Sequence, residues 1–191
     1  EWDSVSVSEI LNLIEDCNFQ MVTRFHWDKM KEAQKYWTQI HSDLEQNILW
    51  IKQLDKNQPI HKQYRLACIK ENIVPQTPEE EFKLDIGIWI PLTWTIDLQA
   101  LINNCKWLID FKTSKSKNRN FMSTKHKLQI VAYMFLSKLE VWWLLYLNQN
   151  WYTLKMLTKD EIIYYTNIWL DLIEYTKELF EKWKIINLAN K

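Results

Sequence analysis

Two aspartates and a lysine stand close together in a stretch whose residues are typical of a pair of strands. Asp97 lies in the first segment, and Asp110 and Lys112 lie two residues apart in the second, with Asn103 and Asn104 between the segments. Asparagine tolerates positive φ, so these two residues suit a two-residue hairpin turn. Side chains two apart in a strand share a face, which puts Asp110 and Lys112 together. The hairpin is therefore predicted to gather both carboxylates and the ammonium on one face of a sheet.

Such a cluster suits a hard divalent cation. Adjacent carboxylates repel each other, which raises the pKa of one of them unless a cation neutralises the pair. Mg²⁺ or Mn²⁺ binds through one or two carboxylates, together with waters and substrate phosphates. A lysine beside such an ion would activate a water or stabilise phosphate charge. The alternative is an ordinary surface hairpin that carries a cross-strand Asp–Lys pair.

The elements that position this cluster follow from the periodicity of the apolar residues. Helices are predicted over 8–17, over 27–54 and, after the break at Asn57–Pro59, over 62–72. A linker with Pro75 and Pro78 leads to an alternating strand over 81–90, and the hairpin follows it. A helix capped by Thr124, strands over 141–147 and 151–157, and a helix from 158 to about 184 complete the chain.

This order, αααβββαββα, predicts an α/β fold with a mixed sheet flanked by helices. We expect a single domain over 1–191, in which residues 1–73 form N-terminal helices, 74–157 the sheet core and 158–191 the C-terminal helix. Thr158 and Glu161 form a capping box at the start of the last helix. Its aromatic residues recur at helical spacing, which favours core contacts over base stacking.

The motifs resemble the PD-(D/E)XK nuclease superfamily, in particular its RecB-like and Cas4-like exonuclease branch. That branch has an Asp closing one strand, D/E-x-K and often Thr on the next strand, and then a helix with Gln-x-x-x-Tyr. An upstream helical His is usually followed by an acidic residue four positions on. The resemblance spans about residues 37–157, and the matching residues are His41, Glu45, Asp97, Asp110, Phe111, Lys112, Thr113, Gln129 and Tyr133.

The resemblance implies a restriction-endonuclease-like core and roles for these residues. His41, Asp97, Asp110 and the Phe111 carbonyl would hold Mg²⁺ or Mn²⁺. Asp97, Asp110, Lys112 and Gln129 would be catalytic, with Lys112 at the attacking water and Gln129 orienting Lys112 or the scissile phosphate. Tyr133 and Thr113 would contact the DNA backbone. Glu81 matches an acidic position that often opens the preceding strand of the family.

Each of these helical assignments has a structural alternative. His41 could be a partly buried helix histidine bonded to Glu45, and Gln129 and Tyr133 could serve as helix-to-sheet packing contacts. His26 and His61 fit no motif and are expected at the surface. The family usually has Gly three residues before its first Asp, whereas this chain has Trp94, which could narrow the substrate path.

A basic loop follows the lysine strand directly. Lys115, Lys117 and Arg119 lie within six residues of Thr113. Beside a metal site, such a loop would contact phosphates and add salt-dependent affinity. A solvated loop with incidental lysines is the alternative.

Composition excludes several classes of protein. A single glycine leaves no glycine-rich phosphate loop, and the three cysteines, Cys17, Cys68 and Cys105, lie far apart without a CxxC pair. We therefore expect no P-loop, disulfide framework or zinc site, and no iron–sulfur cluster of the kind found in some Cas4-like proteins. No apolar run reaches the length of a membrane span, and the formal net charge is zero.

The sequence thus predicts an intracellular, metal-dependent DNA nuclease, with exonuclease action on DNA ends or single strands as the first choice. The products implied by the resemblance are a 5′-phosphate and a 3′-hydroxyl. Two alternatives remain: an inert nucleic-acid-binding or assembly module, or the nuclease part of a larger helicase–nuclease or polymerase. A protein partner or a homo-oligomer fits any of these.

Overall fold

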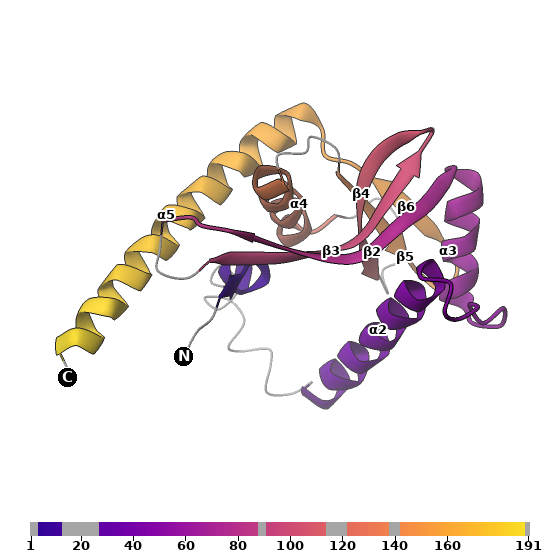
Figure 1. Ribbon diagram of the computed structural model, residues 1–191, viewed down its shortest axis with the longest axis horizontal. Coiled ribbons are helices and arrows are strands. Elements are labelled where there is room, and N and C mark those ends of the chain that lie inside the picture. Colours follow the sequence, from indigo (N-terminus) through magenta and orange to yellow (C-terminus); the bar gives the residue numbers. More distant parts are fainter. Residues whose placement is uncertain (1–3, 13–26, 88–90, 114–121, 138–141, 190–191) are drawn as a thin grey trace.

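The computed structural model describes residues 4–12, 27–87, 91–113, 122–137 and 142–189 (Figure 1). Its elements are β1 (Val5–Ser6), a helical stretch over 7–12, α2 (Trp27–Ile48), α3 (Pro59–Lys70), β2 (Ile73–Leu84), β3 (Leu92–Ile102), β4 (Cys105–Thr113), α4 (Thr124–Ser137), β5 (Trp142–Leu147), β6 (Tyr152–Lys155) and α5 (Lys159–Ala189). The predicted mixed sheet flanked by helices is confirmed.

The six strands of the described residues form one sheet, in which β1 and then β4 pair along one edge of β3, β5 and β6 follow beyond β4, and β2 pairs along the opposite edge of β3. The β1–β3 and β4–β5 pairs are parallel, and the other pairs are antiparallel. Helix α4 provides the crossover that the parallel β4–β5 pair requires. The β3–β4 hairpin turns at Asn103 and Asn104, whose φ angles are 50° and 65°, as the sequence predicted.

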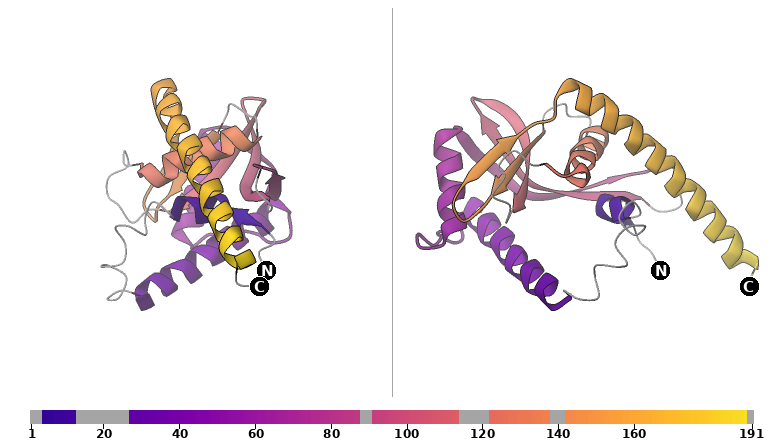
Figure 2. Two further views of the ribbon diagram at one scale, coloured as in Figure 1. Left: turned by 90° about the vertical axis from the view of Figure 1, so that its left-hand side faces the viewer. Right: turned by 180° about the vertical axis from the view of Figure 1, so that it is seen from behind.

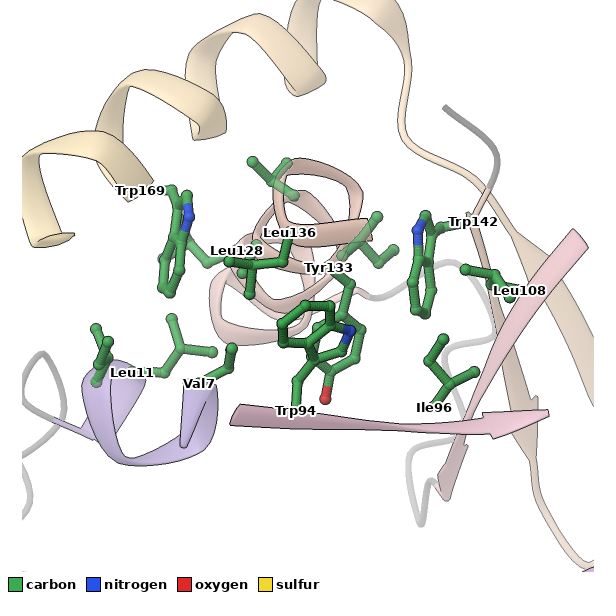
Figure 3. Packing of buried hydrophobic residues seen from close by; sticks show 14 of the residues in the cluster. Val7, Leu11, Trp94, Ile96, Leu108, Leu128, Tyr133, Leu136, Trp142 and Trp169 are labelled. Carbon is green, nitrogen blue, oxygen red and sulfur yellow. The ribbon is translucent and has the colours of Figure 1, made fainter. Parts of the chain in front are cut away.

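Helices cover both faces of the sheet and enclose two apolar clusters (Figures 1 and 2). The first cluster joins the N-terminal stretch, α4 and α5 to the sheet, and Figure 3 shows part of it around Trp94, Tyr133, Trp142 and Trp169. The second joins α2 and α3 to the opposite face. Trp169 of α5 is fully buried, which confirms that this aromatic covers the core.

One strand was not predicted, and another was predicted to begin too late. Strand β1, which precedes every helix, was not predicted, because two residues are too few to show a period. Strand β2 begins at Ile73 instead of residue 81 and contains both prolines of the predicted linker. Proline is tolerated there because, among the described residues, β2 pairs only with β3, so the missing N–H can face the unpaired edge. The register shifts between Pro75 and Thr77.

The second predicted helix was too long. Helix α2 ends at Ile48, and Trp50 has a φ of 60° that ends the helical path. Ile51, which lies within the predicted helix over 27–54, is exposed. Helix α3 begins at Pro59, a residue well suited to a first turn because its missing N–H has no helical acceptor.

His61 was predicted at the surface but is buried. It is 2% exposed, and its Nε2 lies 3.4 Å from Asp43 Oδ2 across the α2–α3 interface. Sequence spacing gave no sign of this contact because it joins two helices. His26 lies outside the described residues. In the part of the chain that is described, no helix is both long and apolar enough to cross a membrane.

Candidate active site

Asp97 lies where strands β3 and β4 separate. The ladder between them starts at Leu98 and Ile109 and runs toward the turn. Ile96 packs in the first apolar cluster and Leu98 in the second. The buried side chains of β3 therefore contact one cluster before Asp97 and the other cluster after it. Asp97 Oδ2 accepts a hydrogen bond from the Phe111 N–H at 2.6 Å. The carboxylate thus satisfies an amide that the β3 backbone no longer reaches.

Asp110 and Lys112 share a face of β4, as predicted. Ile109 and Phe111 point into the second cluster, whereas Asp110 faces the side covered by α4 and is 3% exposed. Burial raises the pKa of Asp110 to about 6, the Lys112 ammonium opposes this rise, and Asp97 adds to it. Lys112 Nζ lies 2.5 Å from Asp110 Oδ2. The ammonium thus contacts the buried carboxylate directly as an ion pair.

His41 reaches the same point from the opposite layer. Its Nδ1 lies 3.6 Å from Asp97 Oδ1, and its ring meets Phe111 edge-on at a centroid distance of 6.0 Å. Burial lowers the pKa of His41, but the Asp97 and Asp110 carboxylates more than offset this effect and raise it overall. The opening between β3 and β4 therefore admits a side chain from α2 into a site otherwise built on the α4 side.

The donor types at this site fit a divalent cation. Asp97, Asp110 and the Phe111 carbonyl are oxygen donors of the kind Mg²⁺ and Mn²⁺ take, and His41 adds an imidazole. The buried Asp110 Oδ2 already contacts one cation, the Lys112 ammonium, and a metal ion would take over that contact. Among the described residues, however, no three His, Cys, Asp or Glu side chains are already grouped to hold a metal ion. Lys112 stands against Asp110, so loading would require the ammonium to move aside.

Gln129 and Tyr133 lie together on α4, on the side that faces Asp110 of the sheet. Gln129 Nε2 donates to the Tyr133 hydroxyl at 2.6 Å, and both side chains are buried. Burial raises the pKa of Tyr133, and the carboxylates of Asp110 and Asp97 raise it further, which places the phenol within their field. The Gln-x-x-x-Tyr pair is therefore linked internally, and Gln129 bonds to Tyr133 rather than to Lys112.

The remaining predicted residues fall into three groups. Thr113 is half-buried at the end of β4, and Glu45 is half-buried on α2. Glu81 is exposed and lies 3.8 Å from Lys83. Lys115, Lys117, Arg119 and Cys17 lie outside the described residues.

Trp94 does not enter the site. It is 5% exposed and stacks on Phe82 of β2 with centroids 5.2 Å apart, inside the first cluster. Trp94 stands where the resembled family usually has glycine, and its side chain is accounted for by packing in the core.

Sequence reasoning missed four residues near the site. Gln99 donates to Glu80, so Glu80 contacts a β3 side chain two residues from Asp97. His126 and Tyr146 meet at 2.6 Å beside Lys112. His126 stands three residues before Gln129, a spacing that puts the two on one side of a helix and was the available signal.

Comparison with known proteins gives little to set beside this geometry. No protein-family profile matches the chain, and no curated protein matches it. Among solved structures, the chain is similar to the crystal structure of SSO0001, with 15% identity and a TM-score of 0.47 over 90% of this chain and 77% of that chain. A likeness of that size assigns neither a family nor a function.

Proposed function

We propose that this chain is a divalent-metal-dependent DNA nuclease with a restriction-endonuclease-like core of the RecB-like type. The observation that carries the proposal is the convergence of Asp97, Asp110, Lys112 and His41 at the point where β3 and β4 separate. These residues come from two strands and a helix of the opposite layer. A buried carboxylate with a raised pKa in such a cluster is typical of functional sites.

The roles follow from where each group lies. Asp97, Asp110, the Phe111 carbonyl and His41 would hold Mg²⁺ or Mn²⁺, which when bound supplies positive charge to the scissile phosphate. Lys112, displaced from Asp110, would hold the attacking water by hydrogen bonding. Tyr133, fixed by Gln129, would keep the adjoining wall of the site in place. Hydrolysis of a phosphodiester bond would leave a 5′-phosphate and a 3′-hydroxyl.

End-labelled single- and double-stranded DNA tests the proposal directly. Cleavage should require Mn²⁺ or Mg²⁺ and stop in EDTA, and Lys112→Ala should lower the rate by about 100-fold or more. Lys106→Ala is the matched control, because Lys106 lies on the same strand and face but is exposed near the hairpin turn. Release of label from ends would indicate an exonuclease. Equal rates for Lys112→Ala and Lys106→Ala would refute the assignment.

An inert binding or assembly module is the second candidate. The observation that favours it is the Lys112–Asp110 ion pair, which neutralises the site without a metal. Titration with Mn²⁺ separates the two, since a ligand that binds only the folded state raises the unfolding temperature. A nuclease should show a rise that Asp97→Asn removes, whereas an inert module should show none in either protein.

A further inference from the structure

The face that carries Asp110 continues past Lys112 onto strands β5 and β6. Lys112 is the register partner of Tyr146, Tyr146 of Thr153, and Leu144 of Lys155. Register partners and residues two apart share a face, so Lys112, Tyr146 and Lys155 lie on one face of three neighbouring strands, with Thr153 directly beside Tyr146 and Lys155 two residues farther along β6. Neighbouring strands are about 4.8 Å apart, so this face extends about 10 Å from the carboxylates toward β6.

His126 of α4 lies over this face of the sheet and contacts Tyr146 of β5. It lies in the first turn of α4, where its backbone N–H donates to the Ser123 hydroxyl, so that Ser123 rather than the predicted Thr124 caps the helix. His126 Nδ1 and the Tyr146 hydroxyl are 2.6 Å apart. Lys155 Nζ stands 5.7 Å from the centroid of the Tyr146 ring. The tyrosine is therefore held between a helix N-terminus and a cationic side chain.

Positive charge surrounds His126. Its pKa falls to about 4 because it is buried and because Lys112 and Lys125 lie nearby, with no carboxylate among the causes. Lys125 bonds to the neutral Asn12 side chain, and Lys127 bonds to Glu161. The pKa of Lys155 is lowered by burial and by Lys127. Four lysines, Lys112, Lys125, Lys127 and Lys155, thus lie around the His126–Tyr146 pair, and two of them pair with Asp110 and Glu161.

We propose that His126, Tyr146 and Lys155, next to Lys112, form a subsite for a backbone phosphate adjacent to the one that is cleaved. This inference rests on the proposed function, because it supplies the second contact that would fix a DNA strand across the site. Lys155 would provide charge, and the His126–Tyr146 pair would provide the one hydrogen-bond donor that their mutual bond leaves unused, at the N-terminus of α4. Phosphate contacts of this kind set the register of a strand and are independent of base sequence.

Equilibrium binding without catalysis tests the subsite. A fluorescein-labelled oligothymidylate is titrated with protein in EDTA at several salt concentrations. Loss of one phosphate contact should make the slope of log affinity against log salt shallower by about 0.7 for a single strand. The affinity of the variant relative to the wild-type protein should therefore be about fourfold lower at 0.15 M salt than at 1 M salt. Lys155→Gln should show this loss, whereas Lys155→Arg and Lys106→Gln should keep the wild-type slope.

Tyr146→Phe provides a second, independent reading. It keeps the ring beneath Lys155 but removes the hydroxyl that contacts His126, and it should weaken binding about three- to tenfold, the value of one hydrogen bond. Circular dichroism and the unfolding temperature check that each variant is folded. An unchanged slope in folded Lys155→Gln, or unchanged affinity in folded Tyr146→Phe, overturns the subsite.

The design separates this inference from the nuclease itself. If the wild-type protein binds DNA with the expected Lys155 dependence but cleaves nothing with any metal, the subsite stands as part of a binding module. If it cleaves DNA while the Lys155→Gln slope is unchanged, the nuclease stands and the subsite is wrong. Failure of the wild-type protein to bind the oligonucleotide overturns the subsite.

Discussion

Replacing Asp110 by asparagine should stabilise the protein at neutral pH in the absence of metal, although it should abolish cleavage. Asp110 is 3% exposed, and burial raises its pKa from 3.8 to about 6, against the opposing effect of Lys112. Each pKa unit corresponds to about 1.4 kcal/mol, so ionising this carboxyl in the folded state costs about 3 kcal/mol. Asparagine keeps the shape of the side chain and removes the charge.

The sign of the pH dependence follows from the raised pKa. Between 3.8 and about 6, the folded state holds a proton that the unfolded state has released. The free energy of unfolding of the wild-type protein therefore falls as pH rises through this window and levels off above it. The advantage of Asp110→Asn should accordingly be about 3 kcal/mol above about pH 6 and should vanish below about pH 4.

Urea unfolding in EDTA at about pH 7 and about pH 4 measures this difference. Asp171→Asn, on an exposed position of α5, serves as the control and should change stability by less than about 0.5 kcal/mol. The reasoning is refuted if Asp110→Asn is less stable than the wild-type protein at neutral pH. The Lys112 ion pair would then outweigh the cost of burying the carboxylate.

Three further predictions concern the frame around the site. Asn104→Val should lower stability by about 1–2 kcal/mol, because a β-branched residue resists the positive φ of 65°, whereas Asn104→Gly should not; thermal unfolding compares them. Thr158→Ala should cost about 1 kcal/mol, since the Thr158 hydroxyl accepts from the Glu161 N–H at 3.2 Å, and a loss no larger than that of Thr124→Ala would contradict this. The His126 ring should titrate near pH 4 by NMR, because burial and Lys112 lower its pKa, and a midpoint near 6.5 would show that it is solvated.

The sheet face that carries Asp110 and Lys112 was predictable because it depends on local geometry. Period-two alternation fixes which side chains of one strand share a face, and the Asn103–Asn104 turn fixes which strand pairs with it. The capping box at Thr158 was predictable for the same reason, since its partners are three residues apart.

Several missed features depend on contacts between distant segments. His61 is buried because α3 packs on α2, and Glu80 lies near the site because Gln99 of β3 donates to it. Strand β1 has an identity only through its pairing with Leu92 and Thr93. None of these contacts leaves a period or a spacing in the sequence.

The sequence by itself thus determined the α/β class, the hairpin and the cluster of one lysine with two carboxylates, because these follow from backbone periodicity over a few residues. Only the tertiary structure decided that β3 and β4 separate at Asp97 and that His41 enters from the opposite layer. It also decided that Asp110 is buried deeply enough to raise its pKa. Burial and electrostatic field are sums over neighbours from the whole chain, which only the folded arrangement specifies.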